Sequence, residues 1–109
     1  MSDTVQPPGT KELTILVLNI APDLEESLID YLLYFEEIEG FTSFQVHGHG
    51  EHHRLSVTEQ VSGRRRRAQY EIFLDLAAIP MILEGLASAV GRDVVYWQQT
   101  ARNFGRIGS

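Results

Sequence analysis

The apolar and polar residues of this chain follow patterns that predict four strands and two helices. In the first strand, LTILVLNI at residues 13–20, apolar side chains fall on both sides of the backbone, so this strand is expected to be buried on both faces. Alternating apolar residues predict the other three strands at 41–47, 68–76 and 93–99. Apolar residues at helical spacing predict the two helices, one from 24 to 35 and one from 79 to 90.

Residues that favour helix ends mark the limits of both helices. Pro22 stands where the first turn of a helix tolerates proline, and acidic residues crowd the turn that follows it. We expect this helix to end near Glu37, with Gly40 beyond it. Asp75 is expected to cap the second helix, and Gly91 to end it.

The order of these elements is βαββαβ, which is the ferredoxin-like, or split βαβ, arrangement. We therefore expect an α+β fold with a four-stranded antiparallel sheet, two helices on one face and a long connection between the second and third strands. Within that connection, Ser56 and Glu59 have the spacing of a capping box, and Gly63 can end a short helix. We divide the chain into a disordered lead at 1–10, a single domain at 11–99 and a flexible tail at 100–109.

One face of this sheet is expected to be open, because both helices pack on the other. The first strand is apolar on both sides, and VVYW at 94–97 continues that pattern in the last strand. A chain of 109 residues buries only about two thirds of its unfolded surface, so a second copy is the simplest cover for the open face. We expect a homo-oligomer, with Tyr96 and Trp97 in the core or at the subunit interface.

Composition excludes several classes of function. The formal net charge of −6 argues against nucleic acid as a partner. The chain has no cysteine, so disulfides, thiolate metal ligands and a cysteine nucleophile are excluded. Its longest apolar run is far shorter than the roughly 20 residues of a membrane helix, so we expect a cytoplasmic protein without membrane insertion. No nucleophile motif or carboxylate pair with acid and base roles is present, so we expect no catalysis.

All four histidines of the chain lie in the segment VHGHGEHHR at 46–54. Neutral imidazole binds zinc, copper, nickel and cobalt, and without thiolates a shell of histidine and carboxylate is the best that this chain offers. On a strand, residues two apart point to one side, and glycines let the backbone turn back toward them. The candidate metal ligands are His47, His49, Glu51, His52 and His53. The alternative is a solvent-facing polar loop that binds metals weakly.

The run RRRR at 64–67 is a concentrated basic segment in an acidic chain. Guanidinium groups bind phosphate and carboxylate in a two-pronged manner, so this run also points to an anion site. The candidate anion ligands are Gly48, Gly50, Arg66 and Arg67. The last two arginines adjoin the third strand and are expected to have a fixed direction. The first two are better explained as a solvated loop end, or by pairing with the acidic residues at 36–39.

Three segments together resemble the PII signal-transduction family, and in particular a small PII-like branch often encoded beside heavy-metal efflux pumps. They are GFTSFQVHGHG at 40–50, LSVTEQVSGRRRR at 55–67 and YEIFL at 70–74. The similarity covers residues 11–98. It implies a compact homotrimer whose sheets face the threefold axis, and a T-loop at 51–67 that reorders on ligand binding to engage a partner. Relatives bind ATP or ADP between subunits, but most of the phosphate-binding loop is missing here, where only Gly91 and Arg92 separate helix from strand.

We therefore expect a non-catalytic PII-like regulatory protein that responds to a transition metal, or assists heavy-metal efflux, through its long loop. The resemblance implies a heavy-metal efflux pump or its regulator as the partner. A metal can switch the loop only if it binds two loop states with different affinity. Two alternatives remain: a sensor of a nucleotide or other anionic small molecule in the cleft between subunits, and a structural trimer that docks on an acidic partner through the arginines.

Overall fold

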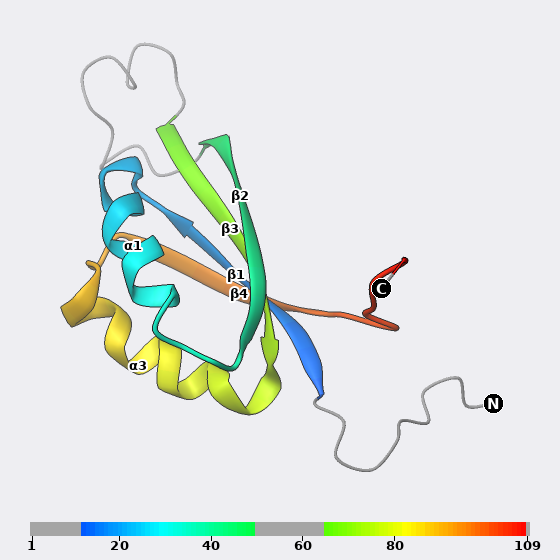
Figure 1. The fold of residues 1–109 in the computed structure, drawn as a ribbon. Coiled ribbons are helices and arrows are strands. Elements are labelled where there is room, and N and C mark those ends of the chain that lie inside the picture. Colours follow the sequence, from blue (N-terminus) through cyan, green and yellow to red (C-terminus); the bar gives the residue numbers. More distant parts are fainter. Residues whose placement is uncertain (1–11, 50–64, 109) are drawn as a thin grey trace.

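The computed structural model describes residues 12–49 and 65–108. Its elements are β1 (Leu13–Ile20), the short 3-10 helix η1 (Pro22–Leu24), α1 (Glu25–Leu32), β2 (Ile38–Gly48), β3 (Arg65–Asp75), a second 3-10 helix η3 (Leu76–Ala78), α3 (Ile79–Ala89) and β4 (Val94–Thr100). The four strands form one antiparallel sheet in the order β2-β3-β1-β4, with both helices on the same face (Figure 1). This confirms the predicted α+β fold and its ferredoxin-like layout.

The first helix is shorter than its apolar spacing predicts, because α1 ends at Leu32 and not near Glu37. After the helix, the backbone N–H of Phe35 donates to the carbonyl oxygen of Leu32 at 3.2 Å, which tightens the chain into a turn. Phe35 still packs against the core. The turn therefore buries Phe35, which a further helical turn was expected to bury. β2 begins at Ile38, earlier than predicted.

The predicted limits of the second helix are confirmed. The Asp75 carboxylate caps η3, because its Oδ1 atom accepts a hydrogen bond from the backbone N–H of Ala77 at 3.1 Å. Pro80 lies in the first turn of α3. Gly91 follows α3 with a φ of 153°, and a Cβ atom at this position would lie 2.9 Å from the side chain of Leu24. Glycine is therefore required there on two grounds.

The core lies between the sheet and the two helices. Its buried members from the strands are Leu16, Leu18, Ile20, Ala68, Tyr70, Ile72 and Leu74, and those from the helical segments are Leu28, Leu32, Ala78, Ile79, Ile82 and Leu86. Gly85 lets α1 approach α3 closely, because a Cβ atom there would overlap the hydroxyl oxygen of Tyr31. That hydroxyl donates to the carbonyl oxygen of Ile82 at 2.8 Å.

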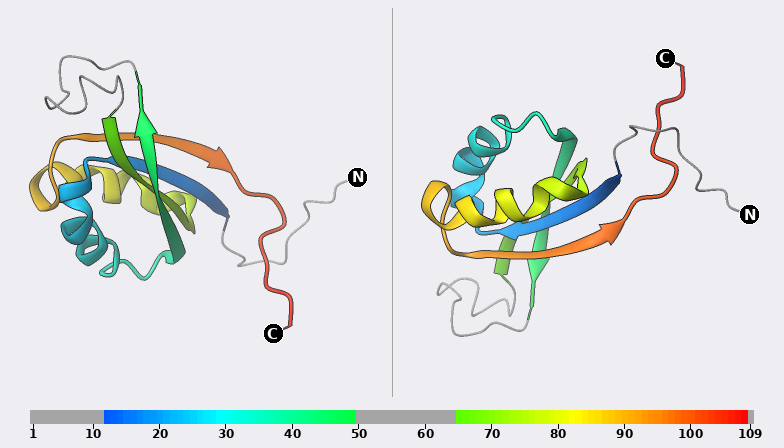
Figure 2. Two further views of the ribbon diagram at one scale, coloured as in Figure 1. Left: turned by 90° about the horizontal axis from the view of Figure 1, so that it is seen from above. Right: turned by 90° about the horizontal axis from the view of Figure 1, so that it is seen from below.

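The other side of the sheet, which we call the open face, carries no helix in the described part of the chain (Figure 2). The register places the following apolar side chains on it: Ile15, Val17, Phe44, Val46, Phe73, Val95 and Trp97. Phe44 is 42% exposed, Val95 44% and Trp97 39%. The ring of Phe104, from the segment after β4, lies 5.2 Å from that of Phe73 between centroids. The open face therefore carries exposed apolar side chains, as the sequence predicts, and the register places Gln69 and Glu71 among them.

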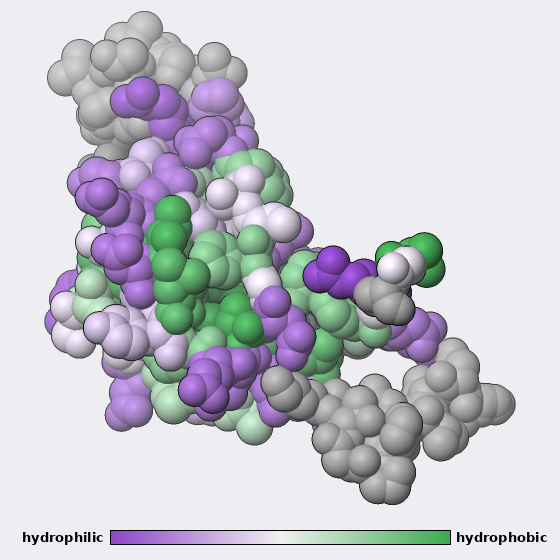
Figure 3. Space-filling view, in the orientation of Figure 1, coloured by the Kyte–Doolittle hydropathy of each residue, from purple (hydrophilic) through white to green (hydrophobic). Residues whose placement is uncertain are grey.

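Tyr96 lies on the helix side of β4, where it is 55% exposed. The prediction places Tyr96 and Trp97 in the core or at a subunit interface, and in the single chain neither is in the core, because Tyr96 is exposed on the helix side and Trp97 lies on the open face. Their place at a subunit interface stays a prediction. Figure 3 shows that the surface over the helices also combines apolar patches with polar surroundings. None of the described helices is long and apolar enough to cross a membrane.

Candidate functional site

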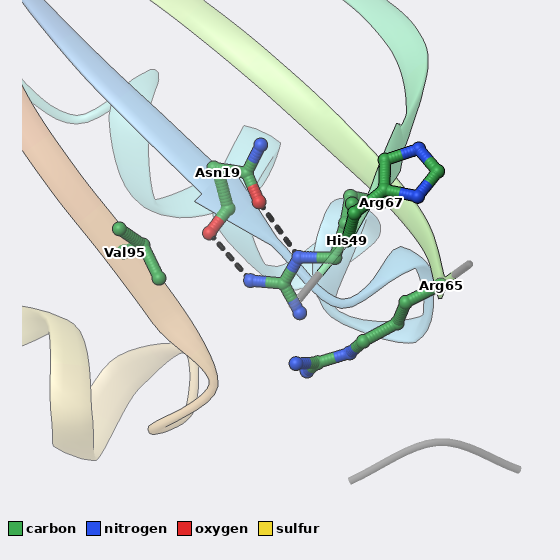
Figure 4. Close-up of a pocket in the computed structure, with 6 residues that line it drawn as sticks. Asn19, His49, Arg65, Arg67 and Val95 are labelled. Atoms are coloured by element: carbon green, nitrogen blue, oxygen red, sulfur yellow. Dashed lines mark hydrogen bonds between the residues drawn. The ribbon is translucent and has the colours of Figure 1, made fainter. Parts of the chain in front are cut away.

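A pocket of about 140 Å³ lies at the end of the sheet from which the connection between β2 and β3 begins (Figure 4). It is lined by Asn19, Gly48, His49, Arg65, Arg67 and Val95. These residues come from the last positions of β1, the end of β2, and the first positions of β3 and β4. The antiparallel register brings them together, because Gly48 pairs with Arg65, and Asn19 pairs with Val95. The pocket therefore depends on all four strands.

Arg67 is the most buried polar residue of this pocket, with 3% of its surface exposed. Its Nε atom donates to Asn19 Oδ1 at 2.7 Å, and its NH2 nitrogen donates to the backbone oxygen of Asn19 at 2.7 Å. Its NH1 nitrogen donates to Asp93 Oδ1 at 2.9 Å. Figure 4 shows the two bonds to Asn19. Every nitrogen of the guanidinium group is thus engaged within the protein, which fixes the side chain.

Arg65 is also buried, at 7% exposure, and donates to the second carboxylate oxygen of Asp93. Asp93 lies just before β4, and its side chain is 31% exposed. Burial tends to raise the pKa of Asp93, but hydrogen bonds and positive charge from Arg65 and Arg67 outweigh burial and hold that pKa below its usual value. Two positive charges and one negative charge leave a net charge of +1 in this cluster.

The two described histidines occupy different surroundings. His49 is exposed and lines the pocket, with its ring turned away from the guanidinium group of Arg67 (Figure 4). His47 is exposed and pairs with Arg66, so strand alternation places it on the helix side of the sheet. β2 ends at Gly48, so the alternation expected to put both imidazoles on one side does not extend to His49.

The other sequence-predicted ligands are only partly placed. Gly50, Glu51, His52 and His53 lie outside the described residues, as do the predicted capping box and the lead at 1–10. Within residues 12–49 and 65–108, no three histidine, cysteine, aspartate or glutamate side chains are grouped so that they could hold a metal ion. Metal binding by the full histidine segment therefore stays a prediction.

The arginine run divides between the two faces of the sheet. Arg66 and Arg67 both lie in β3, so their directions are fixed, but successive residues of a strand point to opposite faces. Arg67 lines the pocket, whereas Arg66 is exposed on the helix side. The expectation of a solvated loop end is wrong for Arg65, which is buried against Asp93. Arg64 lies outside the described residues.

Sequence reasoning missed Asn19 and Asp93, the acceptors that hold the arginines. Asn19 is the one strongly polar side chain in an otherwise apolar strand, and this could have been recognised as a signal. Asp93 has no such local signal. Its role depends on contacts with residues 26 and 28 positions away in the chain.

A second polar cluster lies on the helix side of the sheet and joins α1 to β2 and β3. The hydroxyl of Tyr70 donates to Glu25 Oε1 at 2.7 Å, and Gln45 Nε2 donates to Glu25 Oε2 at 3.2 Å. Burial, followed by the bond to Glu25 and its charge, raises the pKa of Tyr70 to about 12. The cluster therefore anchors the start of α1 on the sheet.

Comparison with known proteins identifies the family. Residues 10–108 match a family model described as "Protein of unknown function (DUF3240)". The chain belongs to the DUF3240 family. A DUF3240 family protein from Shewanella baltica OS155 has a similar structure, with a TM-score of 0.74 at 21% identity, covering 91% of this chain and 100% of that one.

A functionally unknown protein from Pediococcus pentosaceus ATCC 25745 is also similar, with a TM-score of 0.59 at 10% identity, covering 90% of this chain and 100% of that one. No curated protein matches the chain. At these identities the structural likeness shows the fold alone. Membership of the DUF3240 family does not establish the PII-like assignment, which stays a prediction.

Proposed function

We propose that this protein is a non-catalytic, PII-like regulatory protein that senses a transition metal through its histidine segment and signals through the connection between β2 and β3. The candidate ions are zinc, copper, nickel and cobalt, for which neutral imidazole is a suitable ligand. The observation that supports the proposal is the position of His49. It belongs to the histidine segment and also lines the pocket at the base of the connection.

The base of the connection is well suited to passing on a change at His49. Arg67 is held by Asn19 and Asp93, so the chain enters β3 in a fixed position. Gly48, the neighbour of His49, pairs with Arg65. A metal ion that binds His49 together with other histidines would move His49 while Arg67 and the start of β3 stay in place. Occupancy of the metal site would therefore be coupled to the backbone arrangement of the connection.

Asp93 lessens the electrostatic repulsion that a cation meets at this pocket. Without its carboxylate, Arg65 and Arg67 would place two positive charges beside His49 and repel a metal ion. The carboxylate reduces this local charge to +1. Exposure of the imidazole leaves it accessible to the ion.

We further propose that the protein acts in the cytoplasm as a homo-oligomer, a trimer as the PII resemblance implies, and that its partner is a heavy-metal efflux pump or its regulator. The exposed apolar residues Phe44, Val95 and Trp97 on the open face support assembly. Surfaces of this kind mark interaction sites on soluble proteins.

Calorimetric titration tests the metal response. Metal-stripped, untagged protein would be titrated with zinc, copper(II) and nickel beside a variant in which His49, His52 and His53 are all replaced by alanine. We expect saturable binding in the micromolar range or tighter, at a fixed ratio of metal to subunit, which the variant loses. The matched control replaces three exposed residues outside the histidine segment by alanine, namely Glu36, Ser88 and Arg106, and should bind as wild type does. Weak, unsaturable binding that the histidine variant retains would contradict the proposal.

The pocket supports a second candidate function, a sensor of an anionic small molecule. Arg65 and Arg67 supply positive charge, but Arg67 already donates to Asn19 and Asp93, so an anion has to compete with the Asp93 carboxylate. Asp93→Asn should therefore tighten the binding of ADP or cyclic AMP, and Arg67→Met should abolish it. Arg66→Met is the matched control, because Arg66 lies on the other face. No binding of these ligands to wild type or to Asp93→Asn would remove this candidate.

A further inference from the structure

The side of α1 that faces away from the core carries exposed apolar side chains. Ile29 and Leu33 lie four positions apart, so they are neighbours on the helix surface, and both are exposed. Leu33 is 70% exposed. The same helix already supplies Leu28 and Leu32 to the core. Packing within the single chain therefore leaves Ile29 and Leu33 largely in contact with solvent.

This apolar row lies beside β2. α1 and β2 run in opposite directions, and Glu25 at the start of α1 contacts Gln45 of β2 (Figure 1). Leu33 comes eight positions after Glu25, about 12 Å along a helix, and Phe41 comes four positions before Gln45, about 13 Å along a strand. Leu33 is therefore level with Phe41, which is only partly buried. Figure 3 shows apolar atoms gathered over α1 with polar atoms around them. We call Ile29, Leu33 and Phe41 the α1 strip.

Acidic side chains border the α1 strip. Glu26 and Asp30 are exposed on α1, and each stands three positions before one of the exposed apolar residues, so the two kinds of side chain are neighbours. Glu36, also exposed, follows in the turn before β2. Residues 12–46 contain no lysine or arginine. The strip is therefore apolar along its length and negatively charged at its border.

We propose that the α1 strip docks a basic amphipathic helix of a partner protein. Apolar side chains of that helix would pack on Ile29, Leu33 and Phe41, and its lysines or arginines would lie against Glu26 and Asp30. An apolar row with a spacing of four residues suits a partner helix better than an extended segment. The inference goes beyond the proposed function, and it rests neither on the metal response nor on assembly through the open face.

The charge of the border selects this occupant. An anionic membrane surface would be repelled by Glu26 and Asp30. A second copy docked through the same surface would bring two acidic borders together, which like-charge repulsion opposes. A helix that carries both apolar and basic side chains satisfies the strip and its border at once.

Fluorescence anisotropy with a labelled peptide tests the docking. The probe is an amphipathic peptide of about 14 residues, composed of leucine and lysine at helical spacing, and it is titrated with the full chain. We expect saturable binding that weakens as salt is added. The same peptide with glutamate in place of lysine, or with serine in place of leucine, should not bind.

Two variants test the apolar part of the site. Leu33→Ser and Ile29→Ser should each weaken binding of the leucine–lysine peptide by roughly tenfold, because each removes apolar surface that the peptide would cover. The matched control is Ile107→Ser, since Ile107 is fully exposed in the segment after β4 and lies away from α1 (Figure 1). This control should bind the peptide as wild type does.

A charge-matched pair of double variants tests the acidic border. Glu26→Gln with Asp30→Asn should weaken peptide binding by roughly tenfold and reduce its dependence on salt. Glu12→Gln with Glu71→Gln removes the same charge elsewhere, because Glu12 precedes β1 and Glu71 lies on the open face. This control should stay within about threefold of wild type. Glu25 is kept in every variant because it anchors α1 on the sheet.

Binding of the peptide that Leu33→Ser and the Glu26/Asp30 variant both retain would overturn the inference, as would a wild type that does not bind the peptide. Vesicles of phosphatidylglycerol that bind wild type but not Leu33→Ser would assign the strip to a membrane instead. Sedimentation in which wild type assembles and Leu33→Ser does not would assign it to a second copy. A urea midpoint close to that of wild type verifies that each variant is folded, and the high exposure of Leu33 makes its variant the safest.

Discussion

Replacement of Arg67 by methionine tests the structural account of the pocket most sharply. Methionine keeps an unbranched apolar chain of similar length, so the packing of the arginine stem is largely preserved. The change removes every hydrogen bond from the guanidinium group to Asn19 and Asp93. It also leaves the two acceptor oxygens of Asn19 without this donor in a partly buried setting.

The expected loss can be estimated from the burial of this group. Removal of one partner from a buried ion pair costs about 3–5 kcal/mol. Asp93 keeps Arg65 and is partly exposed, so its carboxylate is not left without a counter-ion. We therefore expect the lower end, about 3 kcal/mol, which reduces the ratio of folded to unfolded protein by about a hundredfold.

Urea denaturation followed by Trp97 fluorescence measures this loss. With a slope of about 1–3 kcal/mol per molar urea, the midpoint should fall by about 1–3 M. Protein concentration must be equal for all variants, because assembly adds to apparent stability. The matched control is Arg66→Met, whose side chain is exposed on the other face, where the loss of a surface interaction should cost no more than about 1 kcal/mol. Equal costs for the two variants would refute the assignment of Arg67 as the buried anchor.

Three further predictions concern other groups. The lowered pKa of Asp93 means that its stabilisation is present above the unfolded value of 3.8 and is lost as pH falls through the lower folded value. Asp93→Asn should remove this acid dependence of the urea midpoint, and an unchanged pH profile would contradict it. Burial and the adjacent carboxylate raise the pKa of Tyr70, so stability should fall as pH rises from 10.0 to about 12. Tyr70→Phe should lack this decline, and a variant that keeps it would place its origin elsewhere. Gly85→Ala should cost about 1–3 kcal/mol in urea denaturation because its Cβ overlaps the Tyr31 hydroxyl. Gly40→Ala, with nothing within 4 Å, is the control and should change stability by less than about 1 kcal/mol; equal costs would refute the overlap.

Local signals account for the success of the fold prediction. β1 was predictable because apolar residues on both faces of a short run are typical of a buried strand, and the structure places β1 between β3 and β4. The cap at Asp75 depends on a contact with a backbone group two residues away. The end of α1 was mispredicted because Phe35 continues the helical spacing, while a turn and not a helix buries it.

The pocket depends on contacts that sequence spacing does not reveal. Arg67 reaches Asn19 across 48 positions and Asp93 across 26. A run of arginines is usually a solvated segment, so the burial of Arg65 and Arg67 became evident only when Asn19 in β1 and Asp93 just before β4 were placed as their acceptors. Arg66 is exposed, as is usual for an arginine, because strand alternation turns its side chain toward the other face of the sheet.

Amide hydrogen exchange with and without saturating zinc tests the central claim most directly, because it reports whether metal at the histidines reaches the base of the connection. We expect zinc to change exchange at residues 46–49 and 65–67, while the amides of α3 stay unchanged. The variant lacking His49, His52 and His53 should show no change. Saturating zinc that leaves exchange at 46–49 and 65–67 unaltered in wild type would contradict the proposed metal response.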